Sequence, residues 1–390
     1  MNKISYAKLK CFFVNVSKRV VTCNFCLLTK MIPASWLLLP LSLLNIIIAL
    51  PSTCAASNVQ RNFASALKLG DLEKVSSILN TGVVQVNAYS PSGRTPLLLS
   101  VEYRKQSIAQ LLLERGAEPN TADNDGVTPL WIAAGNGDVD IAKLLLAHGA
   151  NPNADEAGLT PLHVAASYNF SEMAQLLVAA GADVNKGDAM GQGQTALWLA
   201  AEKNFSVMIS VLHEIGADCE AASKLGDQPT HVASHFGFNT VLEALKQCGA
   251  SMVPTNRRGL TPLHVAAMEG HVETAKWLVL KNNVNPNMRT ASTGGSALHY
   301  AVVHSDIPMI HALLSLGSTI DMQDHTTGWT ALHTAAAHNV KDVVKVLLES
   351  GANPHIKDNE GMIPLELAKI QKLDGIVALL ETKVMQQLEL

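Results

Sequence analysis

The segment Thr160-Pro161-Leu162-His163-Val164-Ala165-Ala166 occurs again, unchanged, at residues 261–267. Variants of its first four residues begin at Thr128, Thr195, Ser296 and Thr330, and looser copies begin at Thr95, Gln228 and Ile363. The nine copies start at positions 95, 128, 160, 195, 228, 261, 296, 330 and 363, so that the steps between them are 32 to 35 residues. Such a period predicts an array of repeated units, each of which packs against its neighbours.

The repeated phrase has the features of a helix start. A Thr or Ser hydroxyl can accept a hydrogen bond from a free backbone N–H, and Pro fits the first helical turn. The alanine pairs that follow favour helix and let neighbouring helices approach closely. An apolar stripe such as Ile141 to Leu146 predicts a second, amphipathic helix, and Gly149 suits the left-handed backbone found after a helix. Each unit is therefore predicted to be a helix, a turn, a second helix and a protruding hairpin.

The period, the Thr-Pro-Leu-His phrase and the alanine pairs resemble the ankyrin repeat family, and the resemblance covers residues 58–390. It implies an all-α solenoid in which short β-hairpins connect the helix pairs. A more polar unit that begins near Asn62 fits the period one step earlier and would cap the array. We therefore expect about ten repeats, with starts near residues 62, 95, 128, 160, 195, 228, 261, 296, 330 and 363.

The same resemblance implies a non-enzymatic module that binds another protein. Ligands of the family lie along the hairpin tips and the concave groove formed by the first helices. By this resemblance, the residue five positions after the His of the phrase faces the groove. The expected partner-binding residues are Tyr103, Tyr168, Lys203, Phe236, Glu269 and His304. The exposed aromatic residues among them would make good interface anchors, although packing against neighbouring turns would explain them equally well.

The histidines of the phrase do not form a metal site. Equivalent residues of stacked repeats lie about 10 Å apart, whereas zinc ligands lie about 2 Å from one shared ion. We expect these histidines to form hydrogen bonds between neighbouring repeats. The sequence also contains no nucleophile elbow, catalytic triad or complete phosphate loop. No catalytic, cofactor-binding or metal-binding residue is therefore expected, and no cofactor. Cys219 and Cys248 could form a disulfide between adjacent repeats or remain buried thiols.

Charge argues against nucleic acid as the partner. The chain up to Gly70 contains eight of the 29 basic residues and no acidic residue. The remainder therefore carries 21 basic and 33 acidic residues, a net charge of about −12. Phosphate binding needs a basic surface, so that another protein is the expected partner.

The first 56 residues have the pattern of an export segment. No charged side chain occurs from Met31 to Gln60, basic residues precede this stretch, and small residues follow its apolar core. This pattern predicts a cleaved secretory signal, with Met1 or Met31 as the start. Alternatively, residues 31–50 are long enough for an uncleaved membrane anchor. The chain would then be a membrane-anchored scaffold, and a further alternative is an accessory domain of an enzyme complex. Both N-terminal interpretations place the repeats outside the cytoplasm; a cytosolic protein is the third possibility.

Overall fold

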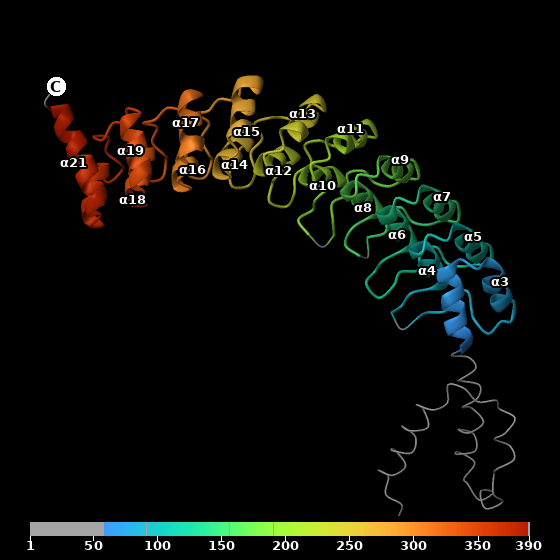
Figure 1. The fold of residues 1–390 in the computed structure, drawn as a ribbon. Coiled ribbons are helices and arrows are strands. Elements are labelled where there is room, and N and C mark those ends of the chain that lie inside the picture. Colours follow the sequence, from blue (N-terminus) through green and yellow to red (C-terminus); the bar gives the residue numbers. More distant parts are fainter. Residues whose placement is uncertain (1–57, 91, 156, 190, 389–390) are drawn as a thin grey trace, which may run out of the picture. The chain divides into compact units, whose positions relative to one another are not determined.

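The computed structural model describes residues 58–388, except for positions 91, 156 and 190. Within that range the chain forms ten consecutive helix pairs (Figure 1). The first pair consists of the helix over residues 58–69 and α3 (Leu72–Asn80). The predicted all-α solenoid of about ten repeats is confirmed.

The first helices of the next nine repeats begin at the repeated phrase. They are α4 (Pro96–Glu102), α6 (Pro129–Asn136), α8 (Pro161–Ser167), α10 (Ala196–Glu202), α12 (Pro229–His235), α14 (Pro262–Met268), α16 (Ala297–Val303), α18 (Ala331–Ala337) and α20 (Pro364–Ile370). The second helices are α5 (Gln106–Glu114), α7 (Val139–Ala147), α9 (Ser171–Ala179), α11 (Ser206–Glu214), α13 (Asn239–Gln247), α15 (Val272–Lys276), α17 (Ile307–Ser315), α19 (Lys341–Glu349) and α21 (Asp374–Leu388).

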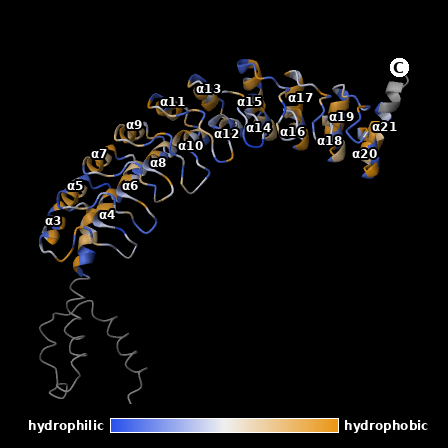
Figure 2. Cartoon of the chain, turned by 180° about the vertical axis from the view of Figure 1, so that it is seen from behind, coloured by the Kyte–Doolittle hydropathy of each residue, from blue (hydrophilic) through white to orange (hydrophobic). Residues whose placement is uncertain are grey.

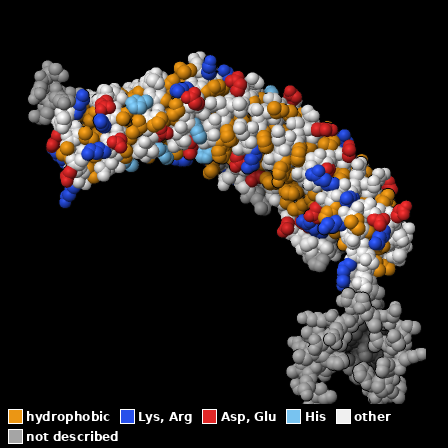
Figure 3. Space-filling view, in the orientation of Figure 1, with side chains coloured by type: hydrophobic (Ala, Val, Ile, Leu, Met, Phe, Trp, Pro, Cys, Tyr) orange, Lys and Arg blue, Asp and Glu red, His pale blue; other side chains and the backbone are white. Residues whose placement is uncertain are grey.

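The core lies between the two rows of helices and between successive repeats. From α4 to α20, each first helix packs on the next first helix along the chain. Leu162, Ala165 and Ala166 are at most 1% exposed, as the close approach of α8 to its neighbours requires. Burying one such leucine contributes about 1.5–3 kcal/mol to stability. Hydrophobic residues are concentrated on the helices (Figure 2), while charged side chains of both signs are scattered over the surface (Figure 3).

The predicted helix starts and stops are present. The Thr128 hydroxyl accepts a hydrogen bond from the N–H of Trp131 at 3.2 Å, which satisfies one of the free donors at the start of α6. Gly149 follows α7 with a φ of 85°, a left-handed conformation that costs glycine little. At the matching position of a later repeat, Asn283 has a φ of 54° and follows the π-helical turn η3 (Trp277–Lys281).

The connections between repeats differ from the expected β-hairpins. No strand occurs among the described residues. The tip of each connection, meaning the loop that protrudes between two repeats, is closed by backbone hydrogen bonds. Examples are Asp123 N–H to Val127 O and Gly126 N–H to Asp123 O, both 3.0 Å. Neighbouring tips are joined by bonds such as Arg257 N–H to Leu225 O at 3.1 Å. A strand ladder needs a longer run of paired residues, so the connections are tight turns.

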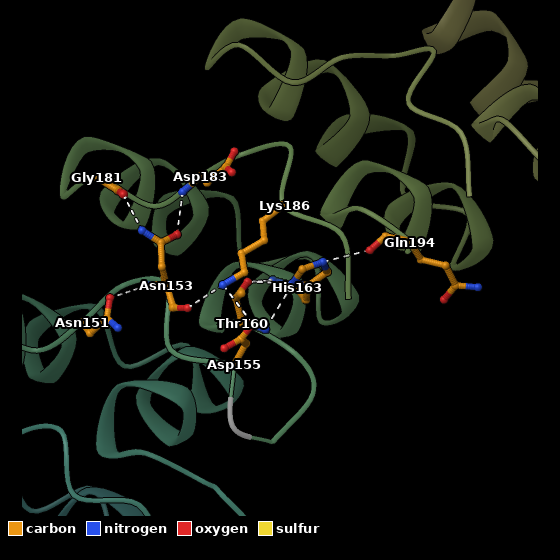
Figure 4. Close-up of polar contacts among 9 residues, drawn as sticks. All are labelled: Asn151, Asn153, Asp155, Thr160, His163, Gly181, Asp183, Lys186 and Gln194. Atoms are coloured by element: carbon orange, nitrogen blue, oxygen red, sulfur yellow. Dashed lines mark hydrogen bonds and ion pairs between the residues drawn. The ribbon is translucent and has the colours of Figure 1, made fainter. Parts of the chain in front are cut away.

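Asparagine side chains join each tip to the following repeat. Asn153 Nδ2 donates to the Gly181 carbonyl at 2.8 Å, and its Oδ1 accepts from the Asp183 N–H at 2.7 Å (Figure 4). One amide thereby satisfies a donor and an acceptor of the turn that ends the next repeat's second helix. The same bracket is formed by Asn87, Asn120, Asn185 and Asn287.

The asparagine bracket is incomplete at three repeats. Glu220 and Asp321 occupy its position but have no donor, and each accepts a single backbone N–H, at 2.8 and 2.9 Å. Val253 occupies the same position with an apolar side chain that is 41% exposed. The bracket is therefore missing at the boundary that joins residues 228–260 to residues 261–295.

The histidines of the phrase connect neighbouring repeats, as expected. His163 Nδ1 accepts the N–H of Thr160 at 3.2 Å, and His163 Nε2 lies 2.9 Å from the carbonyl of Gln194, which precedes the next repeat (Figure 4). A carbonyl oxygen only accepts, so Nε2 carries the hydrogen and the imidazole is neutral. The equivalent pairs are His231 with Leu260, His264 with Met288, His299 with Trp329, and His333 with Met362.

Burial keeps these imidazoles neutral. Loss of solvation lowers the pKa of His163, His231, His299 and His333, and lowers the pKa of His264 to about 4. Four of the nine copies of the phrase lack the imidazole, because Leu98, Trp131, Trp198 and Glu366 take its place. The Nε1 atoms of both tryptophans make no hydrogen bond to the described residues.

We predict that His264→Gln flattens the loss of stability in acid. Each folded-state pKa lies below 6.5, so the unfolded chain takes up protons first, and the stabilisation present above pH 6.5 is lost as the pH falls toward the folded-state pKa. For His264 this window runs from pH 6.5 to about 4. The slope of unfolding free energy against pH should fall by up to about 1.4 kcal/mol per pH unit. Urea unfolding at a series of pH values measures it.

The matched control for this substitution is His311→Gln. His311 is exposed on α17 and lies outside the repeated phrase. Both variants keep every carboxylate of the chain, so the contribution of carboxylate protonation to the pH dependence of stability is the same in both. Equal slopes for the His264 variant and this control would contradict the assignment.

We predict that Asn153→Ala destabilises the array by about 1–3 kcal/mol, because two hydrogen bonds between repeats are lost at about 0.5–1.5 kcal/mol each. Asn153→Asp should cost less, since a carboxylate still accepts the Asp183 N–H. The control is Asn151→Ala, because Asn151 Oδ1 accepts a bond only within its own loop. Thermal unfolding of the three variants tests the order; a control as damaging as Asn153→Ala would show that the bracket is unimportant.

Candidate functional site

A pocket of about 490 Å³ opens on the first helices near the middle of the array. α10 contributes Trp198 and Glu202, α12 contributes His231, Val232 and His235, and α14 contributes Val265 and Met268. The tips contribute Leu225, Asp227, Asn256, Arg257, Arg258 and Leu260, and Phe236 and Glu269 complete the lining. The pocket therefore spans three repeats and extends from their tips to the ends of their first helices.

The six candidate residues occupy one structural position. Tyr103, Tyr168, Lys203, Phe236, Glu269 and His304 are the residues that follow the last turn of α4, α8, α10, α12, α14 and α16. Phe236 and Glu269 line the pocket, whereas the other four lie outside it. Tyr168 is 60% exposed, Lys203 and His304 are exposed, and Tyr103 is half-buried. The structure thus brings two of the six together in one pocket.

Aromatic side chains form the apolar wall of this pocket. The Phe236 ring is 41% exposed and stacks on Phe238, with ring centroids 5.4 Å apart. The His235 ring meets Phe236 edge to face at 4.7 Å. These contacts fix the orientation of Phe236 while leaving one side of its ring accessible. Leu225, which is 55% exposed, adds apolar surface from the tip.

The polar wall of the pocket contains charges of both signs. The imidazole Nδ1 of His235 lies 3.2 Å from Glu269 Oε1, and Asn256 Nδ2 donates to Asp227 Oδ1 at 2.7 Å. Arg257 and Arg258 are exposed, and neither forms an ion pair with any residue that the structure describes. The acidic groups of the pocket therefore have partners nearby, while the two guanidinium groups remain available to a bound carboxylate.

The repeat at the centre of this pocket departs from the repeated phrase at three positions. Gln228 replaces the capping Thr, Thr230 replaces the Leu, and Ser234 replaces the second Ala. The Gln228 Oε1 and the hydroxyls of Thr230 and Ser234 are buried without a hydrogen-bond partner among the described residues. A buried polar group without a partner costs about 1–3 kcal/mol. This repeat also carries Val253, where the asparagine bracket is missing.

The candidate residues predicted from the sequence all follow the first helices. That prediction therefore missed the loop residues that also line the pocket. Leu225, Arg257 and Arg258 lie in loops, and only the stacking of two repeats brings them beside Phe236. The sequence contained one usable signal, because Arg257 and Arg258 contrast with the acidic tips at Asp123, Asp125 and Asp155.

The segment expected to direct export or anchoring lies outside the described residues. This applies to residues 1–56, including the apolar stretch 31–50. Within the part of the chain that the structure does describe, no helix combines the length and the apolar character needed to cross a membrane.

Comparisons with known proteins agree with the fold. A family model described as ankyrin repeats in three copies matches residues 115–188, 231–324 and 298–387, and a model of a single ankyrin repeat matches residues 92–124. A protein described as Notch-regulated ankyrin repeat-containing protein, from Homo sapiens and from Mus musculus, is 35% identical over 77 residues. That match covers 19% of this chain and 68% of the relative. The chain belongs to the ankyrin repeat family.

Proposed function

We propose that the array binds an extended segment of another protein in the pocket around Phe236. Ankyrin repeat proteins typically act as non-enzymatic binding modules, and repeats of this family mediate protein–protein contacts. The observation that carries the proposal is the combination, in one pocket, of exposed apolar side chains with two arginines that form no ion pair with a described residue. Binding requires no bond to be made or broken, only a rigid surface.

The lining of the pocket specifies the chemistry of the partner. An apolar side chain of the partner would pack against Phe236, Leu225 and Met268, where water is readily displaced. A carboxylate two or three residues away would reach Arg257 or Arg258, because a guanidinium matches a carboxylate in a bidentate geometry. The partner segment is therefore apolar with an acidic flank.

Contacts beyond the pocket would complete the interface. A stable interface covers about 800 Å² on each partner, so the bound protein would also reach neighbouring positions of the first-helix column. Tyr168 and Lys203 precede the pocket in that column, and His304 follows it. We place them at the rim, where single substitutions cost less than at a buried centre.

We predict that Phe236→Ala weakens partner binding by more than about 1 kcal/mol, roughly fivefold in Kd, and more than Tyr168→Ala does. The partner is first captured from the source cells on the immobilised full chain and identified by mass spectrometry. Its Kd is then measured for each variant by calorimetry. Charge reversal, Arg258→Glu, should weaken binding and reduce its salt dependence, because an attractive charge pair is lost.

Two controls separate binding from folding. Leu280→Ala removes a side chain that is 65% exposed and outside the pocket, and should leave the Kd unchanged. Leu177→Ala removes a fully buried side chain of α9 and should cost about 2–5 kcal/mol of stability. If Phe236→Ala destabilises the chain as much as Leu177→Ala does, Phe236 is a core residue and the pocket assignment is wrong.

We further propose that the chain acts outside the cytoplasm, after export through residues 1–56. The support is the sequence pattern alone, with its uncharged stretch from Met31 to Gln60 behind a basic region. A membrane-anchored scaffold that uses residues 31–50 is the alternative. The mass of the exported protein distinguishes them, since cleavage shortens the chain and anchoring does not.

We predict that replacing both Leu43 and Ile47 with Arg abolishes export and membrane association. Each arginine at the centre of an apolar segment costs about 2.5–3.5 kcal/mol on insertion scales. Fractionation of the source cells followed by immunoblotting gives the distribution of the chain. The control replaces the same residues with Phe and should leave the distribution unchanged. An unaltered distribution of the arginine variant would exclude this segment as an export signal.

A further inference from the structure

Three potential metal ligands meet on the second-helix side of the array, away from the pocket lining. His213 lies in the last turn of α11, Cys219 lies in the turn that follows, and Cys248 is the residue after α13. Cys219 Sγ is 3.6 Å from His213 Nδ1, and the three potential ligand atoms all lie within 4.8 Å of one another. Both cysteines are free thiols. The cluster therefore joins the repeat at residues 195–227 to the repeat at residues 228–260.

These distances fit a single tetrahedral ion. Zinc binds sulfur at about 2.3 Å and imidazole nitrogen at about 2.0–2.1 Å, which places a sulfur and a nitrogen ligand about 3.5 Å apart and two sulfur ligands about 3.8 Å apart. The observed 3.6 Å between Cys219 Sγ and His213 Nδ1 matches the first separation. The 4.8 Å limit on the remaining pairs leaves at most a small side-chain adjustment to reach the second.

The donor set selects the class of ion. Two thiolates and one imidazole favour zinc and other soft ions over magnesium or calcium, which prefer oxygen ligands. Without an ion, burial raises the pKa of Cys219 to about 12 and raises the pKa of Cys248 as well, so both remain thiols. The charges of Asp218 and Glu220 disfavour a bare thiolate at Cys219 and favour a cation there.

We propose that His213, Cys219 and Cys248 bind one zinc ion or a similar soft divalent cation, as a clamp between adjacent repeats. Binding forms two metal–sulfur bonds and one metal–nitrogen bond, and releases the two thiol protons to solvent. His213 is exposed, so a fourth ligand such as water can reach the ion. The clamp acts on a repeat that buries polar groups without a hydrogen-bond partner among the described residues, and it would offset part of their cost.

Cobalt is the probe for this site. The protein is the full chain with Cys11, Cys23, Cys26 and Cys54 replaced by Ser, reduced and freed of metal with a chelator. We expect one equivalent of Co²⁺ to give a near-ultraviolet thiolate-to-cobalt absorption band, one equivalent of Zn²⁺ to remove it, and about two protons to be released per ion. Zn²⁺ should also raise the Tm, because it binds only the folded chain with all three ligands in place.

Variants locate the site. Cys219→Ser and Cys248→Ser should each abolish the band, and His213→Gln should weaken Zn²⁺ binding. His311→Gln, another exposed histidine on a second helix, is the matched control and should bind like the parent chain. If a cysteine variant fails to fold, protection of Cys219 and Cys248 from alkylation by Zn²⁺ in the parent chain provides the same test.

Either of two results would overturn the proposal. The first is a parent chain that binds Co²⁺ without a thiolate band or leaves both cysteines open to alkylation in Zn²⁺. The second is recovery of the chain from its source cells with a Cys219–Cys248 disulfide, read from peptide masses. Neither result depends on the partner or on the pocket around Phe236, so this test is separate from that of the proposed binding function.

Discussion

Side chains that complete the backbone hydrogen bonds of the next repeat fix how the repeats of this array align with one another. A helix pair of this size cannot bury its own apolar face, so each repeat depends on its neighbours. Apolar packing between repeats supplies most of the stabilising free energy, but it does not by itself prevent one repeat from shifting relative to the next. The asparagine bracket and the histidine bond fix the register, because a displaced repeat would leave a turn donor or a carbonyl without its partner. Asn153 joins the repeat at residues 128–159 to the repeat at residues 160–194, and His163 joins that second repeat to the one that begins at Thr195.

The sequence was sufficient to predict those structural features that depend on the residues of a single repeat. The Thr128 cap and the Gly149 turn follow from local backbone chemistry, and both are present. The Asn153 bracket could not be predicted in this way, because asparagine in a loop is already explained by turn propensity and its partners lie 28 and 30 residues further along the chain. The same reason applies to the pocket and to the His213 cluster, whose members come from different repeats.

The repeat at residues 228–260 combines several local departures from the pattern. Thr230 and Ser234 place hydroxyls where neighbouring repeats bury carbon, and Val253 removes the bracket. Natural proteins tend to break their local rules at functional sites. Here the weakened repeat contributes the centre of the pocket and one ligand of the thiol cluster.

The uneven distribution of histidine gives the array a direction. From His231 onward, every contact between successive repeats contains a buried imidazole, whereas Leu98, Trp131 and Trp198 occupy the position in three of the four earlier copies of the phrase. A fall in pH therefore weakens the contacts between repeats in the C-terminal half of the array and leaves most contacts in the N-terminal half unchanged. Acid would open the array progressively from its C-terminal half, and the pocket, which lies where the two halves meet, would lose its shape while the N-terminal repeats remained folded.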